Sequence, residues 1–264
     1  HPIALSIRVP PLPTLKFETV PGIPLIQPGD DLVEIIASAL ASAEQTLNDG
    51  DVVCVAQKII SKAEHRQFRL ADVKPGDAAR ALAAETDKEP ALCQLILDES
   101  ESILRKKPGV IIVRHRLGHV GANAGIDQSN IEHGDGDGAL LLPVDPDASA
   151  QRLRAGLRER LGVNVGVMIT DSMNRPWRLG TIGGSIGVAG VEVLDDLRGG
   201  EDMFGRELKV SMVNRADSLA ATATLLMGET VEGTPVVLIR GLAPVDTTQT
   251  TADMIRPTAD DLFT

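Results

Sequence analysis

Aromatic side chains are the scarcest feature of this 264-residue chain, which has four Phe, one Trp and no Tyr. Proteins that hold single-stranded nucleic acid stack its bases on such rings. Basic residues are also in the minority, with 26 Lys and Arg against 37 Asp and Glu for a formal net charge of -11, and no basic run interrupts that balance. Together these deficits argue against nucleic acid as a partner.

Cysteines and long apolar runs are scarce as well. Cys54 and Cys93 lie in the apolar segments VVCVA and ALCQLIL without the spacing of metal ligands, so we expect buried free thiols. No apolar run approaches the ~20 residues that cross a bilayer, and no signal-peptide pattern opens the chain. We therefore expect a cytoplasmic protein without a membrane partner, in which His1 and Pro2 are a remnant of expression.

Familiar ligand-binding motifs are missing too. There is no GxxxxGK[ST] loop, and LGTIGGSIGVAG lacks the strand-to-helix context of a dinucleotide fingerprint. His115 and His119 flank a strand-like turn, where an i, i+4 interval does not place them on one face for zinc. Asp135 and Asp137 resemble a calcium loop, but Ala139 stands where a third oxygen ligand belongs, which favours a flexible loop. Any nucleotide must be bound by placed cations, backbone amides or divalent metal ions.

Hydrophobic periodicity predicts alternating strands and helices. Helices are expected over 30–45, with Asp30 or Asp31 as N-cap, and over 77–88, 90–106, 149–162 and 216–228. Strands are expected over 3–9, 51–60, 164–171, 179–193, 206–214 and 234–241, and another begins at 109–113. With no internal repeat and no long linker, the chain 1–264 reads as one α+β (mixed α/β) domain of one or two lobes, whose strand order stays open.

Three carboxylates stand next to small residues at element boundaries: Asp127 in NAGIDQSN, Asp171 at the end of GVMITD, and Glu229 after LLMG. Hard oxygen ligands of this kind hold Mg²⁺ or Mn²⁺ and let the metal bridge phosphate oxygens. For any one of them alone, a cap or turn acid is the favoured interpretation. Their separation in the sequence does not show whether they meet.

Two basic signals accompany these acids. Ser61 and Lys62 could offer a hydroxyl and an ammonium group to phosphate, or Lys62 could be a solvated lysine at a strand exit. Arg175 and Arg178, in RPWR, carry guanidinium groups suited to carboxylate or phosphate, and we assign them to an anionic substrate. The residues by themselves support an enzyme that acts on small anions, with or without a metal.

Taken in order, several segments resemble the F420-0:γ-glutamyl ligase family, and the resemblance spans nearly the whole chain. They are GIPLI at 22–26, ISKAE at 60–64, NAGIDQSN at 123–130, LLLPVDPD at 140–147, ITDS at 169–172, RPWRLG at 175–180, LLMGE at 225–229, PVVLIRG at 235–241 and the C-terminal RPTADDLF. No single piece is specific, but their number and order are.

The resemblance implies a GTP-dependent ligase with a family-specific fold and an intertwined homodimer. The terminal carboxylate of F420-0 would attack the γ-phosphate of GTP, and the amino group of L-glutamate would displace phosphate from the resulting acyl phosphate; further γ-linked glutamates could follow. Divalent Mg²⁺ or Mn²⁺ at two sites, with K⁺ as a further cation, would offset the repulsion between carboxylate and triphosphate. The nitroreductase-like domain fused to some relatives is absent, so no flavin is expected.

Residue roles follow from the same resemblance. The metal ligands would be Asp127, Asp171, Ser172 and Glu229. Asp127, Asp171 and Lys62 would be catalytic, with Ser61 contacting the substrate. The nucleotide contacts would be Ile23, Pro24, Leu25, Ile26, Gln57, Lys58, Lys62, Asn130, Met227, Gly228, Glu229, Thr230, Val231, Glu232, Gly233 and Thr234.

The chain departs from the family pattern at a few positions. His65 and Asn174 stand where glycine is common. Gln57 and Lys58 replace a pair of small hydroxyl residues, which leaves the choice between GTP and ATP open. Two rival functions remain: a metal-dependent nucleotide phosphohydrolase, in which similar carboxylates activate water, and a non-catalytic cofactor-binding protein.

Overall fold

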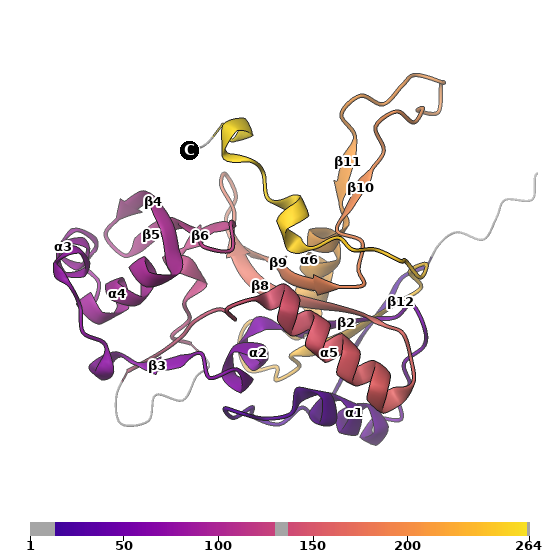
Figure 1. Cartoon of the computed structure of the whole chain (residues 1–264), viewed down its shortest axis with the longest axis horizontal. Coiled ribbons are helices and arrows are strands. Elements are labelled where there is room, and N and C mark those ends of the chain that lie inside the picture. The colour runs from indigo at the N-terminus through magenta and orange to yellow at the C-terminus, as the bar shows by residue number, and fades with distance from the viewer. Residues whose placement is uncertain (1–13, 130–136, 263–264) are drawn as a thin grey trace, which may run out of the picture.

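The computed structural model describes residues 14–129 and 137–262. A five-stranded sheet at its centre has the order β1-β12-β2-β8-β9. These strands are β1 Lys16–Thr19, β12 Val236–Arg240, β2 Val52–Ala56, β8 Gly166–Asn174 and β9 Thr181–Ala189. Only β2 and β8 pair in parallel, and the other neighbours are antiparallel (Figure 1). The carboxyl ends of β2 and β8, which are far apart in the sequence, therefore lie side by side at one end of the sheet.

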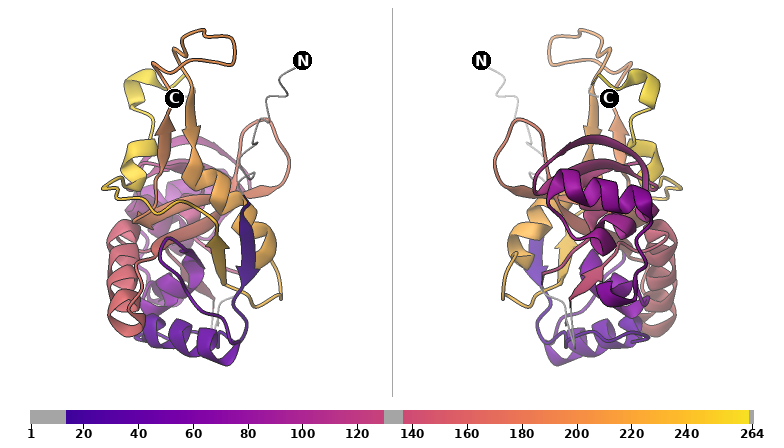
Figure 2. Two further views of the ribbon diagram at one scale, coloured as in Figure 1. Left: turned by 90° about the vertical axis from the view of Figure 1, so that its right-hand side faces the viewer. Right: turned by 90° about the vertical axis from the view of Figure 1, so that its left-hand side faces the viewer.

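Helices cover both faces of this sheet. One face packs against α1 (Leu32–Ser42) and α5 (Pro146–Leu161), and the other against α6 (Arg215–Met227), which gives three layers (Figure 2). Along β2, Val53 and Val55 face the first layer, whereas Val52 and Cys54 face the second. A strand buried on both sides reads as a continuous apolar run, as VVCVA does.

The expected N-cap of the first helix is confirmed at Asp31, whose carboxylate accepts from the backbone N–H groups of Val33 and Glu34 at 2.9 and 3.2 Å. Such a bond satisfies donors that the first turn leaves unpaired. The expected buried free thiols are confirmed for Cys54 and Cys93.

A second core lies beside the central sheet. Here α3 (Asp77–Thr86) and α4 (Pro90–Glu99) pack on the antiparallel sheet β4-β5-β6, which comprises β4 Ser100–Lys107, β5 Val110–His115 and β6 Val120–Ala122 (Figure 1). The ribbon β3 (Gln67–Arg69) and β7 (Gly138–Leu140) joins it to the rest of the chain. The mixture of helices and sheets agrees with the expected α+β class.

The hairpin of β10 (Leu194–Asp196) and β11 (Met212–Asn214) projects from the body, and we call residues 194–214 the arm (Figure 1). The C-terminal segment carries the short helices η3 (Thr251–Met254) and η4 (Thr258–Asp260). Its Asp261 forms an ion pair with Arg114 of β5. None of the helices in the described ranges has the length and apolar character needed to cross a bilayer.

Several expected element boundaries were wrong. The strand expected over 51–60 ends at Ala56, and α2 (Gln57–Ala63) begins at once. The helix expected over 90–106 ends at Glu99, because the following residues pair with β5 as a strand. Of the strand expected over 206–214 only Met212–Asn214 forms, and β1 was not anticipated. The strand expected over 3–9 lies outside the described residues.

Candidate functional site

A cleft of ≈ 580 Å³ opens at the carboxyl ends of the parallel strands β2 and β8. This is where open sheets with parallel strands place their ligand sites, because the connections that leave adjacent strands diverge there. The cleft is lined by residues drawn from five segments, 23–26, 56–62, 122–129, 170–172 and 224–235, together with Thr181 of β9. Segments that are up to about two hundred positions apart thus share one cavity.

The three carboxylates identified in the sequence all line this cleft. Asp171 stands on β8, and Asp127 follows the short helix η2 (Asn123–Gly125), held by paired backbone hydrogen bonds of 2.9 and 2.8 Å to Leu140. Glu229 follows α6, which ends at Gly228 with a positive φ of 73°. The fold therefore brings together acids that the sequence alone could not show to meet.

Cations and hydroxyl groups already contact these acids. Lys58 forms an ion pair with Asp127, and its Nζ also lies 3.4 Å from the backbone oxygen of Ser129. The Ser172 hydroxyl donates to Glu229 Oε1 at 2.5 Å. Lys58 and Lys62 lie one turn apart on α2, so both face the cleft.

Electrostatics single out Asp171. Burial, and then repulsion from Asp127, raises the pKa of Asp171 to about 7, although the Ser172 N–H and Lys58 counteract the rise and Glu229 adds to it. Its side chain keeps partial exposure to the cleft, so the carboxylate can be reached by a ligand. A cleft in which one acid resists ionisation beside two others is a site that attracts cations.

The chemistry of the donors fits Mg²⁺ or Mn²⁺, which prefer carboxylate and hydroxyl oxygens. Within the described residues, however, no three His, Cys, Asp or Glu side chains converge closely enough to hold a metal ion. Lys58 and Ser172 instead occupy carboxylate oxygens of Asp127 and Glu229. Carboxylate oxygens that could bind a metal are therefore present. A divalent cation that bound them would replace the Lys58 ammonium and the Ser172 hydroxyl.

The segments expected to contact a nucleotide also line the cleft. They comprise Ile23, Pro24, Leu25, Ile26, Gln57, Lys58, Lys62 and the run from Met227 to Thr234. Gln57 is buried, and its amide Nε2 has no hydrogen-bond partner among the described residues. An unsatisfied buried donor at a cleft wall is costly unless a ligand pairs with it. Gln57 is therefore a candidate ligand contact.

Three expected contacts do not line the cleft, and a fourth is not among the described residues. Ser61 is fully buried, and its hydroxyl donates to Gln57 Oε1 at 2.8 Å, so it supports the cleft from beneath. Arg175 and Arg178 are exposed in the turn between β8 and β9 and do not line the cavity. Asn130 lies outside the described residues.

Sequence reasoning did not single out several polar residues of the cleft: Ser129, Thr170, Thr181 and Thr224. Thr170 and Ser129 stand next to or near the predicted acids, which was an available signal. No sequence signal marks Thr181 or Thr224, because they reach the cleft only through the pairing of β9 with β8 and the packing of α6.

The described histidines and aspartate that were considered as zinc or calcium ligands do not line the cleft. Contrary to expectation for their spacing, the rings of His115 and His119 meet, stacked nearly parallel with centroids 4.9 Å apart. Asp137 precedes β7, and Asp135 lies outside the described residues.

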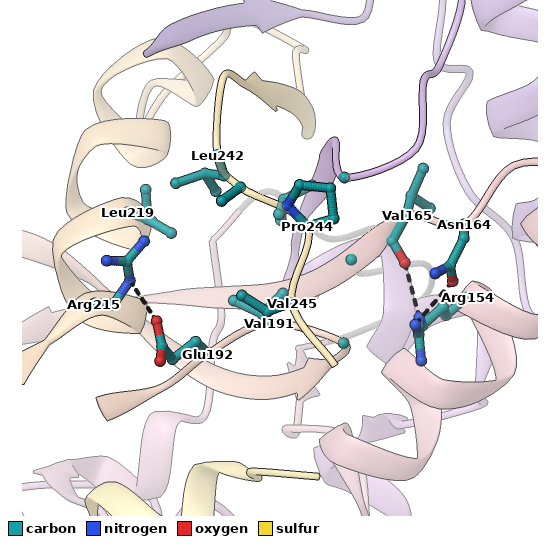
Figure 3. A pocket seen from close by; sticks show the side chains of 15 residues that line it. Arg154, Asn164, Val165, Val191, Glu192, Arg215, Leu219, Leu242, Pro244 and Val245 are labelled. Carbon is teal, nitrogen blue, oxygen red and sulfur yellow. Dashed lines mark hydrogen bonds and ion pairs between the residues drawn. The ribbon is translucent and has the colours of Figure 1, made fainter. Parts of the chain in front are cut away.

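A much smaller cavity of ≈ 30 Å³ lies near the opposite, amino ends of β2 and β8 (Figure 3). Its two guanidinium groups are already engaged: Arg154 donates to the Val165 carbonyl and to Asn164 at 2.8 and 2.9 Å, and Arg215 pairs with Glu192 at 3.2 Å. The size of this cavity and its satisfied charges leave the large cleft as the candidate site.

Most of the chain is similar to proteins of known function. Residues 22–241 match the family described as F420-0:Gamma-glutamyl ligase. The chain is 48% identical over 233 residues to the coenzyme F420:L-glutamate ligase of Methanopyrus kandleri, covering 88% of this chain and 89% of that protein. It is 44% identical over 230 residues to the protein of the same name from Archaeoglobus fulgidus, covering 86% and 89%. For Methanothermobacter thermautotrophicus the identity is 43% over 222 residues, covering 84% and 87%.

Proposed function

Because this chain belongs to the F420-0:gamma-glutamyl ligase family, we propose that it is a ligase that joins L-glutamate to F420-0 at the expense of GTP. The observation that carries the proposal is the single cleft, in which Asp127, Asp171 and Glu229 share the walls with the segments 23–26 and 227–234. Acids and backbone-rich loops in one cavity suit a substrate that carries a triphosphate.

The proposed reaction has two steps. A carboxylate oxygen of F420-0 attacks the γ-phosphorus of GTP, and the bond to the β-phosphate oxygen breaks to release GDP. The amino group of L-glutamate then attacks the acyl carbon, loses a proton and expels inorganic phosphate, which leaves an amide. Repetition of both steps on the new terminal carboxylate, with another GTP, would add further glutamates.

We assign Asp127, Asp171, Ser172 and Glu229 to hold Mg²⁺ or Mn²⁺. When bound, such ions supply positive charge that offsets the repulsion between carboxylate and triphosphate. The ammonium groups of Lys58 and Lys62 add to this along α2. The walls of the cleft would keep water from the acyl phosphate before the amine arrives.

We also propose that the protein acts as a homodimer through the arm. The arm carries several exposed apolar side chains: Leu197, Met203, Phe204, Val210, Met212 and Val213. Met203 and Phe204 are 95% and 93% exposed. Contiguous apolar surface on a projecting hairpin is typical of an interface between subunits.

Turnover assays test the ligase proposal. Purified protein is incubated with F420-0, L-glutamate, Mn²⁺ or Mg²⁺ and either GTP or ATP, and product masses are read. We expect one nucleoside diphosphate for each glutamate added, and no sustained release of diphosphate when glutamate or F420-0 is omitted. Steady diphosphate release without glutamate, with the precursor unchanged, would instead identify a phosphohydrolase.

Asp171→Asn, with Asp246→Asn as its control, separates an enzyme from a binding protein. Asp246 is an exposed acid that does not line the cleft. Loss of the Asp171 charge should lower kcat at least about 100-fold, the range measured when one electrostatic group is removed from an active site. The Asp246 variant should match the wild type.

A further inference from the structure

Trp177 occupies a position that packing does not explain. The sole tryptophan of the chain is 88% exposed at the turn between β8 and β9. Its φ of +67° lies in the left-handed region, which a bulky side chain adopts only at a cost. An indole that is both exposed and held in an unfavourable backbone conformation contributes little to folding, and such conformations concentrate at ligand sites.

Two free cations flank this indole. Arg175 and Arg178 are exposed, and neither guanidinium has a hydrogen-bond or ion-pair partner among the described residues. The chain as a whole carries a net charge of -11, and the cleft itself is lined by acids. The tip of the hairpin is therefore a local positive group beside a negative cavity, next to an aromatic surface.

The hairpin that carries Trp177 forms part of the cleft wall. Ser172 pairs with Gly183 in the β8–β9 ladder, and Asn174 pairs with Thr181. Ser172 and Thr181 both line the cleft, and the turn of residues 175–180 begins directly after the last of these pairs. A ligand that reaches from the cleft along the hairpin would meet Trp177 and its two arginines.

Resting on the proposed function, we propose that Trp177, with Arg175 and Arg178, binds F420-0, an acidic deazaflavin precursor, by its planar aromatic ring and its anionic tail. The ring stacks on the indole, and the guanidinium groups pair with the phosphodiester or carboxylate charges. Of the F420-0 molecule, the acidic cleft then receives only the reacting carboxylate, beside the triphosphate of GTP. A second copy of the chain is a less fitting occupant, because the arm already offers several exposed apolar side chains for such a contact.

A titration that needs no turnover tests this assignment. With one tryptophan and no tyrosine, indole emission reports on Trp177 alone. Adding the deazaflavin precursor without nucleotide should quench the emission and shift it to shorter wavelength, as burial of the indole demands. An unchanged emission wavelength at saturating precursor, with binding established by dialysis, would overturn the assignment.

Steady-state kinetics give the second readout. Trp177→Ala should raise the KM for the deazaflavin precursor about tenfold or more, in keeping with base–aromatic stacking, and leave the KM for GTP unchanged. Trp177→Phe should restore most of the affinity, because it keeps a ring. The exposed Val144, outside the cleft, supplies the control Val144→Ala.

The possible outcomes separate the two proposals. If the wild type forms no glutamyl product but the titration shows a blue-shifted, quenched indole, the ligase proposal fails and the binding role stands. If the wild type forms product and the Ala variant keeps the wild-type KM, only the binding role fails. A lower sedimentation coefficient for the Ala variant with an unchanged KM would assign Trp177 to a subunit contact.

Discussion

Asp171 is the residue whose environment departs furthest from that of an ordinary surface acid. Its raised pKa, about 7, means that the carboxyl group of the metal-free protein is largely protonated at pH 6 and largely ionised at pH 8. A metal ion must displace that proton to use the oxygen, so metal affinity and pH are linked.

The first prediction therefore concerns Mn²⁺ affinity of the chelator-treated protein, measured by calorimetry. Affinity should rise about tenfold from pH 6 to pH 8, since one proton is released per ion bound. In Asp171→Asn the affinity should be weak and its pH dependence flat.

Glu232 provides the matched control for that titration. It lines the same cleft, but its own backbone N–H and that of Thr230 hold the pKa of its carboxyl group below the ordinary value. Glu232→Gln should therefore keep the wild-type pH slope. A slope that disappears in Glu232→Gln and survives in Asp171→Asn would refute the role given to Asp171.

His119 makes the stability of the fold depend on pH. Burial, and then its neighbour His115, lowers the pKa of His119 to about 4 from an ordinary 6.5. The unfolded chain takes up this proton first as pH falls, so the folded state loses stability between pH 6.5 and 4. Asp171, whose pKa is raised, changes stability in the other direction over the same range, so the contribution of His119 is measured as a difference between proteins. Between pH 7.5 and 5 the wild type should lose about 1–2 kcal/mol of unfolding free energy in urea relative to His119→Gln. His65→Asn, at an exposed position, should keep the pH dependence of the wild type.

Among the elements, β9 shows why glycines gather in LGTIGGSIGVAG. A Cβ at Gly187 would lie 2.5 Å from the backbone oxygen of Pro146 at the start of α5. A Cβ at Gly183 would meet the Ala220 carbonyl of α6 at the same distance. The strand is therefore glycine-rich because helices approach it closely on both faces, and it is not a phosphate-binding loop.

Gly187→Ala should thus lower the free energy of unfolding by about 1–3 kcal/mol, the usual cost of overpacking. Gly121→Ala is the control, because a Cβ on that strand residue meets nothing within 4 Å and its φ is not positive. Urea denaturation of both variants measures the difference. Equal stabilities would mean that α5 does not pack on β9 in this way.

Local patterns predicted the elements that bury an amphipathic or wholly apolar face. The helix α1 and the strand β12 fall within the expected segments, and α5, α6 and β8 overlap theirs with ends shifted by one to three residues. The pattern failed where tertiary pairing overrides it. Residues 100–107 have helical spacing but form β4, since β5 supplies hydrogen bonds along their length.

The same distinction holds for the candidate site. The sequence identified Asp127, Asp171 and Glu229 from their small neighbours, but not that they line one cleft, which depends on how η2, β8 and α6 are arranged in space. The ion pair between Lys58 and Asp127 spans 69 positions and has no local signal. Contacts of this kind follow from topology, which periodicity does not encode.

At the scale of the whole molecule, the arm is the feature that a lone subunit leaves unexplained. Met203→Ser with Phe204→Ser removes its two most exposed apolar side chains. If the arm joins two subunits, this double variant should sediment as a monomer at concentrations where the wild type is a dimer, with unchanged circular dichroism. Val144→Ser, also an exposed apolar position, should remain dimeric. A wild type that sediments as a monomer would contradict the arm's assignment.

Activation of a carboxylate within one cleft is the central claim, and an oxygen label follows it most directly. F420-0 carrying ¹⁸O in its terminal carboxylate is turned over with GTP and L-glutamate, and the inorganic phosphate is analysed by mass. An acyl phosphate transfers one carboxylate oxygen to phosphorus, so each phosphate released should contain one ¹⁸O. Unlabelled phosphate would mean that water, and not the substrate carboxylate, attacks the nucleotide.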